Sequence, residues 1–417
     1  MKKGWLWVAL ALLLAVVIAA WLGRRALPQT QPAAAAPVPA LVIVAEPAAR
    51  ASAPSLVDRR SAAAAPEPDT PKVDVSKEFI DVCGVGRVRR SELERRDSQP
   101  APAWAQALEQ QSELGLAEVL KRLDAGSVKQ RVAAAVLRGD VQAAAQLAAS
   151  ANDAGTYRLG LRACRKDAAY RAAHASANQQ RDPLAASASS GLQMPEMAAP
   201  GTVPHACAAL NFERLELLDP DDAWPSLARL SDAQQQGDEV GVSQALYQIA
   251  QRRRLAVNAR ALSATLADVV GAEPTPGEAW ALVMAVGTDM ASTLDASLSN
   301  VGRSCRPQAL RDANRRQLCE QVTRRMPELV AEAMDSRVLH ALEERMGLPH
   351  SPQALSREQF EQGIAALSED SMRWMAEPTC ANVSDMGRQL VLQSRQGELA
   401  WMRANMKAKP TPASVPR

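Results

Sequence analysis

Aromatic side chains are scarce in this chain of 417 residues, which has three Phe, three Tyr and eight Trp. Single-stranded nucleic acids bind through rows of exposed aromatic rings, so the composition argues against such a platform. Net charge is also lacking, because 48 Lys and Arg oppose 46 Asp and Glu and leave a formal charge of +2. Nucleic-acid binding needs a concentrated basic face. We therefore expect no nucleic-acid partner.

The sequence motifs of common catalytic and metal sites are missing as well. There is no HExxH, no phosphate-binding GxxxxGKS/T, no GxSxG and no SxxK. Of the four histidines, His174, His205, His340 and His350, no two are spaced three or four residues apart. A metal site would therefore have to be assembled from distant segments. We interpret the histidines as surface or loop residues, and we expect no catalytic residue, no metal and no cofactor.

Segments that would build a β-sheet are short and rare, whereas Ala and Leu, both strong helix formers, supply most of the apolar content. Beyond the N-terminal region, one stretch of β-branched residues near 78–88 resembles extended chain, with Gly84 and Gly86 as bends. The sequence therefore predicts an all-α fold of antiparallel helical hairpins, with at most a short β segment there.

The N-terminus contains an apolar run from Trp5 to Leu22 without a polar side chain, closed by Arg24 and Arg25. Eighteen residues of helix span about 27 Å, close to the thickness of a bilayer core. A cleavable signal peptide is the alternative, but its apolar region is usually shorter and is not closed by arginines. We expect residues 1–25 to be a transmembrane signal anchor that attaches the chain to the inner membrane through residues 5–22.

Composition divides the rest of the chain. Residues 26–72 are rich in Pro and Ala and poor in large apolar groups, which predicts a disordered linker. Residues 73–406 form the predicted helical domain, with a long loop at 179–203 as a possible subdivision. Residues 407–417 are predicted to be a disordered tail.

Helical periodicity and capping residues predict individual helices within the domain. Thr275 with Glu278 and Ser356 with Gln359 are capping boxes, which mark helix starts. The expected helices begin near residue 100, with a break near Gly115, and continue at 132–137, 143–151, 157–164, 168–177, 206–218, 222–236, 239–253, 260–270, 275–290, 307–325, 327–346, 357–375 and 384–406.

All six cysteines lie beyond the linker, in an even number and without zinc-site spacing. Such cysteines pair in an oxidising compartment, which favours the periplasm for the domain. We predict three disulfides. Cys164–Cys207 would join the helices on either side of the long loop. Cys305–Cys319 requires a turn between the two, for which Asp312 and Asn314 are suitable N-cap residues. Cys83–Cys380 follows by elimination.

Three clusters invite a functional interpretation, and each also has a structural one. Cys83, beside Arg87 and two further arginines, could be a nucleophile with a lowered pKa, or a disulfide partner in a short strand, which we prefer. The Arg252 to Arg254 run could bind an anionic surface, or complement a helix C-terminus, which we prefer. Asp219, Asp221 and Asp222 could bind calcium, but we interpret them as helix capping.

Trp224, Trp280 and Trp374 are expected in the core.

The segment 218–250 resembles the helical hairpin of tetratricopeptide-type proteins. It carries Leu218-Asp-Pro, Trp224, a Gly237-Asp238 turn and Ala250, and Arg138-Gly139-Asp140 resembles a second hairpin turn. Trp224 and Gly237 are two residues too far apart for the family, and no 34-residue period recurs. The resemblance implies stacked helix pairs and a groove that binds a peptide or protein. The whole chain also resembles uncharacterised exported helical proteins of proteobacteria.

These observations together predict a membrane-tethered periplasmic scaffold or protein-interaction domain without catalysis, whose partner is an envelope protein or peptide. Two alternatives remain open. An envelope enzyme with a site assembled from dispersed residues would show a deep pocket joining ionisable groups with shifted pKa values. An assembly or chaperone-like factor for exported proteins would show a large exposed apolar groove.

Overall fold

The computed structural model describes residues 78–93, 102–179, 204–255, 261–293 and 297–408. These residues are mostly helical and contain one two-stranded sheet, so the helical fold and the short β segment are confirmed. The predicted anchor, the linker and nearly all of the predicted loop and tail lie outside the described residues. Among the described helices, none is both long enough and apolar enough to cross a membrane.

The domain begins with a β-hairpin made of β1 (Phe79–Val82) and β2 (Gly86–Arg89), which pair antiparallel with Ile80 opposite Val88. Gly84 adopts a φ of 72° in the turn, a left-handed conformation that glycine reaches without a steric penalty. Ile80, Val82 and Val88 are buried against Trp104 and other core residues, and the short helix α2 (Arg90–Leu93) follows.

The helices then follow in sequence. They are α3 (Ala103–Asp124), α4 (Val128–Arg138), α5 (Val141–Ala149), α6 (Ala154–Gln179), the 3-10 helix η2 (His205–Ala209), α7 (Phe212–Leu218), α8 (Trp224–Gln236), α9 (Glu239–Gln251), α10 (Ala261–Val270), α11 (Pro276–Thr293), α12 (Ser299–Ser304), the 3-10 helix η4 (Ala309–Arg311), α13 (Ala313–Leu329), α14 (Ala333–Met346), α15 (Arg357–Ala376), α16 (Cys380–Gln396) and α17 (Glu398–Ala408).

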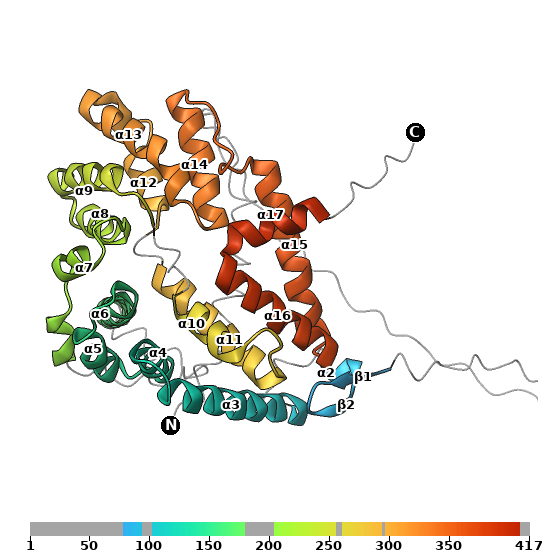
Figure 1. Cartoon of the computed structure of the whole chain (residues 1–417). Coiled ribbons are helices and arrows are strands. Elements are labelled where there is room, and N and C mark those ends of the chain that lie inside the picture. The colour runs from blue at the N-terminus through green and yellow to red at the C-terminus, as the bar shows by residue number, and fades with distance from the viewer. Residues whose placement is uncertain (1–77, 94–101, 180–203, 256–260, 294–296, 409–417) are drawn as a thin grey trace, which may run out of the picture.

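The helices follow a closed path (Figure 1). From α3 the chain passes through α4, α5 and α6 to the α8 and α9 pair, and α13 packs on α9. Helix α14 then contacts α17, and α16 returns to α11, which lies along α3. Most buried apolar residues belong to one continuous core that includes α4, α5, α8, α10 and α13.

Two helical hairpins, α4 with α5 and α8 with α9, share one turn chemistry. Gly139 and Gly237 end the first helix with φ of 73° and 67°, and the following Asp140 and Asp238 each accept a 2.9 Å hydrogen bond from the next helix. A left-handed glycine followed by an N-cap aspartate ends one helix and starts another within two residues. Both turns were predicted from the sequence and are confirmed.

The predicted break near Gly115 is wrong, because α3 runs unbroken from Ala103 to Asp124. Gly115 lies where α3 crosses α11, and a Cβ atom placed there would be 2.3 Å from the Cα atom of Gly277. The glycine therefore permits a close helix–helix contact and does not interrupt the helix.

Other boundaries also differ from the predictions. The helices expected at 157–164 and 168–177 form the single helix α6, since Arg165 and Lys166 between them are good helix formers. Gly397, with a φ of 86°, divides the range 384–406 between α16 and α17. Asn211 accepts a 2.9 Å hydrogen bond from the amide of Arg214 and begins α7 there, which divides 206–218.

Candidate functional site

Three disulfides join elements that are distant in the sequence, and they are the same three pairs that the sequence predicted. Cys83 in the hairpin turn pairs with Cys380 at the start of α16, with Cα atoms 4.4 Å apart. Cys164 on α6 pairs with Cys207 on η2, and Cys305 after α12 pairs with Cys319 on α13, each with Cα atoms 5.7 Å apart. Asp312 caps α13 and supplies the turn that the third pair requires.

The bond to Cys380 overturns the possibility of a nucleophilic Cys83. Its side chain is buried, and its amide donates a 2.8 Å hydrogen bond to the carbonyl of Pro378. A cysteine acts as a nucleophile through its thiolate, which a disulfide does not provide. Cys83 therefore fastens the N-terminal hairpin to the C-terminal helices.

The acidic segment before α8 and the basic segment after α9 contact each other. The Arg254 guanidinium lies 2.6 Å from the Asp219 carboxylate, and the Arg252 guanidinium lies 2.7 Å from the carboxylate of Glu216. Asp222 accepts a 3.2 Å hydrogen bond from the amide of Trp224, the first residue of α8, but the N-cap position is occupied by Ala223. Asp219 lies at the C-terminal end of α7, so its interpretation as an N-terminal cap is wrong. The arginines follow the C-terminus of α9, as predicted, and in addition form these ion pairs.

Arg158 of α6 completes this network, and no sequence signal pointed to it. It lies 2.9 Å from the Asp219 carboxylate and 2.7 Å from that of Asp222, and all three side chains are buried. Ion pairing neutralises charges that would otherwise be costly to bury. These carboxylates therefore serve helix packing, and calcium binding is not needed to explain them.

The three tryptophans expected in the core are all buried. Trp224 meets Phe212 edge to face, with ring centroids 5.7 Å apart. Trp280 and Trp374 meet edge to face at 5.1 Å beneath the hairpin. Their rings contribute packing to the core.

A pocket of about 440 Å³ lies between α12 and α14. Its size is within the range of ligand sites in proteins, about 300–1,000 Å³. The residues that line it combine three arginines with an apolar wall: Ser299, Gly302, Arg303, Arg306, Val338, Ala341, Leu342 and Arg345. We call it the basic pocket.

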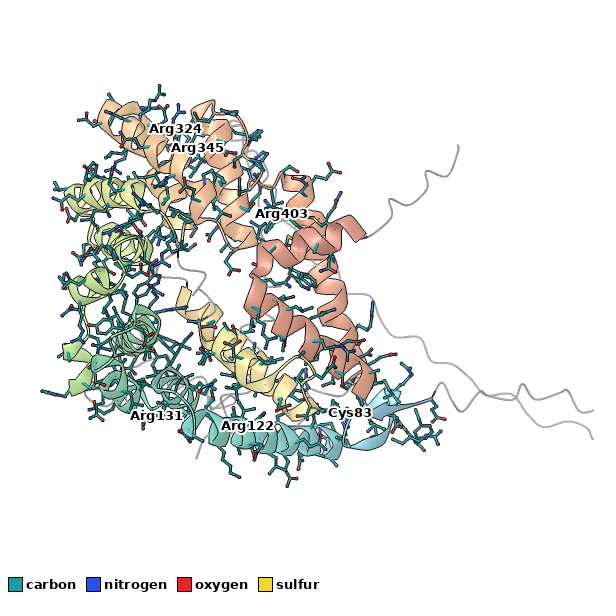
Figure 2. The ribbon with its side chains drawn as sticks, in the orientation of Figure 1. Cys83, Arg122, Arg131, Arg324, Arg345 and Arg403 are labelled. Atoms are coloured by element: carbon teal, nitrogen blue, oxygen red, sulfur yellow. A yellow bond between two sulfur atoms is a disulfide. The ribbon has the colours of Figure 1, made fainter. Side chains whose placement is uncertain are left out.

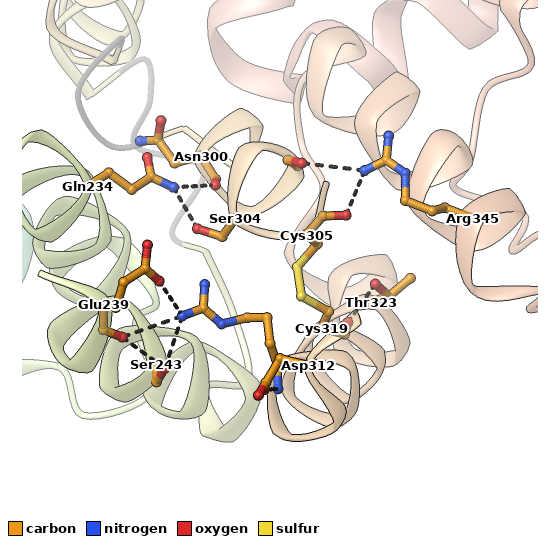
Figure 3. Close-up of a disulfide and its surroundings, with 12 residues drawn as sticks. Gln234, Glu239, Ser243, Asn300, Ser304, Cys305, Asp312, Cys319, Thr323 and Arg345 are labelled. Carbon is orange, nitrogen blue, oxygen red and sulfur yellow. Dashed lines mark hydrogen bonds and ion pairs between the residues drawn. A yellow bond between two sulfur atoms is a disulfide. The ribbon is translucent and has the colours of Figure 1, made fainter. Parts of the chain in front are cut away.

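A disulfide lies next to Arg345, one of the residues that line the basic pocket (Figure 3). Cys305 follows the last residue of α12 and is bonded to Cys319 of α13. From the other side, Arg345 of α14 donates hydrogen bonds to the carbonyls of Cys305 at 2.8 Å and Gly302 at 3.4 Å. A cation at the carbonyl end of a helix is electrostatically favourable, so Arg345 holds α12 and α14 together.

Arg303 and Arg306 differ from Arg345, because both are exposed and neither has an ion pair or side-chain hydrogen bond within the part of the chain that the structure describes. Their charges face solvent beside Val338 and Leu342. An unpaired guanidinium readily binds a carboxylate through two parallel hydrogen bonds. The arrangement suits a ligand that is both anionic and aliphatic.

Buried ionisable groups with shifted pKa values lie outside the basic pocket. Burial raises the pKa of Asp289 on α11, whose carboxylate accepts hydrogen bonds from the amides of Leu262 and Ser263 at the start of α10. Burial also lowers the pKa of Lys166 on α6. Neither residue lines the basic pocket, so this pocket does not combine the features expected of a site assembled for catalysis.

Two of the histidines come together. His350 is exposed in the segment after α14, as predicted for a surface or loop residue, whereas His340 lies on α14 and is partly buried. His340 on α14 and His350 after it stack with ring centroids 4.1 Å apart, next to Glu344. Sequence reasoning missed the pair because it tested only helical spacing between histidines. The available signal was His340 and Glu344 four residues apart, followed by a glycine turn.

Comparison of the chain with protein-family models, with curated proteins and with solved structures found no match.

Proposed function

We propose that this chain is a non-catalytic scaffold of the bacterial envelope, anchored in the inner membrane through residues 5–22, with its helical domain in the periplasm. The apolar run between Trp5 and Leu22 supports the anchor. The pairing of all six cysteines supports an oxidising compartment, because such disulfides are rare in the cytosol. Tetratricopeptide-like stacking of helix pairs is supported by the shared Gly-Asp turns of α4/α5 and α8/α9.

The domain binds its partner at the basic pocket, and the partner is an acidic protein segment with an aliphatic side chain next to a carboxylate. One observation carries this proposal: Arg303 and Arg306 present unpaired charges beside the apolar wall of a pocket large enough for a ligand. Carboxylates would meet the guanidinium groups, and the aliphatic side chain would cover Val338 and Leu342.

The test is fluorescence polarisation with the purified chain and a labelled peptide in which Glu alternates with Leu. Binding should weaken at least about tenfold when Arg303 and Arg306 are both changed to Glu, equivalent to about 1.4 kcal/mol. It should also weaken as salt rises, because exposed charges are screened. Arg131→Glu is the matched control, since Arg131 is an exposed arginine of α4, at a distance from Arg345 (Figure 2).

Equal binding of the peptide by the double variant and the wild type would refute binding at the basic pocket. Equal affinity of the wild type for a peptide with Gln in place of Glu would refute it as well. The anchor is tested separately by N-terminal sequencing of the mature protein and by fractionation. A mature N-terminus between positions 20 and 35 would contradict it.

The chaperone-like alternative has less support. Large apolar side chains with high exposure are scattered over several helices, for example Leu114 on α3, Leu217 on α7 and Tyr247 on α9. Single exposed apolar residues are normal on monomeric proteins. The exposure of these residues therefore does not by itself support such a factor.

A further inference from the structure

The C-terminal end of α14 brings three metal-binding side chains to one place. His340 and Glu344 are four residues apart on the helix, so they share a face. The helix ends at Gly347, whose φ of 67° reverses the chain direction. The following residues then return to α14 and place His350 against His340.

The three side chains lie close together, as binding of a single metal ion requires. The rings of His340 and His350 are nearly parallel, at 9° and 4.1 Å between centroids. One ligand atom from each of His340, Glu344 and His350 lies within 4.8 Å of the other two. Bond lengths of about 2.0–2.2 Å to zinc put ligand atoms about 3.3 Å apart in a tetrahedral site. The side chain of Glu344 is 57% exposed, so it is free to rotate toward the two rings.

A buried carboxylate holds His350 in position. One oxygen of Glu343 accepts a 3.0 Å hydrogen bond from the amide of Ser351, and the other lies 3.3 Å from Nδ1 of His350. Glu343 is 3% exposed, so its position is fixed by packing. A carboxylate bound to one ring nitrogen orients the other toward a metal, and this pairing recurs around histidine ligands in metalloproteins.

We propose that His340, Glu344 and His350 bind a single divalent zinc ion, with a water molecule as the fourth ligand. Two imidazole nitrogens and one carboxylate oxygen suit zinc, whereas calcium and magnesium prefer oxygen ligands alone. Glu343 and Glu344 supply two negative charges near the rings. Arg337, whose guanidinium lies 3.3 Å from Nδ1 of His340, supplies one opposing charge. Bound zinc would fasten the α14–α15 connection to α14, outside the basic pocket.

Isothermal titration of the untagged full chain with zinc chloride tests the site. One zinc ion should bind per chain, and the affinity should fall at least about tenfold in His340→Ala and in His350→Ala, equivalent to about 1.4 kcal/mol. Glu343→Gln should weaken binding about 10–100-fold through loss of its support for His350. Zinc should also raise the unfolding temperature of the wild type, because a ligand of the native state stabilises it.

His205→Ala is the matched control, since His205 is an exposed histidine on η2 and should leave zinc binding unchanged. Circular dichroism of each variant, compared with that of the wild type, separates loss of the site from loss of the fold. The proposal fails if the wild type binds no zinc, or if a correctly folded His340→Ala, His350→Ala double variant binds it with wild-type affinity and stoichiometry.

Discussion

At the scale of single residues, Asp335 is a carboxyl group in an unfavourable environment. It lies in the first turn of α14 and is 7% exposed. Burial, with a smaller contribution from the nearby negative charge of Glu398, raises its pKa to about 7. The hydroxyl of Ser297 donates a 3.5 Å hydrogen bond to it, which opposes the shift without cancelling it. Asp335 is therefore partly protonated in the native protein at neutral pH.

Because of the raised pKa of Asp335, we expect the free energy of unfolding to fall as pH rises. Between about pH 4 and pH 7 the native state holds a proton that the unfolded chain has released, so the stabilisation present at low pH is lost through this range. Asp335→Asn removes the effect and keeps a hydrogen-bonding group. Relative to wild type, its free energy of unfolding should improve by about 2–3 kcal/mol between pH 5 and pH 8.

Urea unfolding of both proteins at the two pH values measures this difference. An unchanged difference between Asp335→Asn and wild type across the range would show that the carboxyl group is ionised in the native state throughout. Glu92→Gln, a change to a carboxylate on the short helix α2, is a control for general effects of charge removal.

At the scale of elements, the crossing of α3 and α11 depends on Gly115. Its missing Cβ atom would lie 2.3 Å from the backbone of Gly277, so Gly115→Val must push the two helices apart. We expect a loss of about 1–3 kcal/mol in the free energy of unfolding, measured by urea titration.

Gly287→Ala provides the contrasting change within α11. Nothing lies within 4 Å of a Cβ atom placed at Gly287, and its φ is not positive. Alanine should therefore stabilise the helix by about 0.5–1 kcal/mol. If Gly115→Val proved as stable as wild type, the close approach of the two helices would be wrong.

Sequence signals that act between neighbouring residues predicted the helix starts correctly. The same signals failed where contacts between distant residues determine whether a helix continues or ends. The capping boxes at Thr275 and Ser356 begin α11 and α15 as expected, because their hydrogen bonds lie within four residues. Gly115 and Gly397 show the limit. One lies inside an unbroken helix and the other separates two helices, and only the packing partner of Gly115 and the backbone angle of Gly397 distinguish them.

At the scale of the whole molecule, the disulfides could be predicted from the sequence, whereas the basic pocket and the buried ion pairs could not. The cysteine pairs could be inferred from loop positions and elimination, since pairing is a choice among few combinations. The basic pocket joins α12 to a face of α14 that is more than thirty residues away. Arg158 meets Asp219 across 61 residues. Neither relation leaves a periodic or spacing signal in a single sequence, so both required the structure.

The three disulfides should contribute unequally to stability. In the chain-entropy model a bond that closes a longer loop restricts the unfolded chain more. The separations of 297, 43 and 14 residues for Cys83–Cys380, Cys164–Cys207 and Cys305–Cys319 correspond to about 6, 4 and 3 kcal/mol. Replacing each pair by alanines and measuring urea unfolding gives the order. A reversed order would show that native packing near the bonds outweighs loop length.

The bond between Cys83 and Cys380 also constrains the order in which the disulfides form during synthesis. Cys83 is the first cysteine made, and Cys380 is the last, 297 residues later, which corresponds to about 15–60 seconds of synthesis. Cys164 emerges well before Cys380, so oxidation in order of appearance would join Cys83 to Cys164. The native pattern therefore requires either that Cys83 stay reduced until the end or that a wrong bond be exchanged by thiolate attack. A chain that takes the second route needs a disulfide isomerase as well as an oxidase.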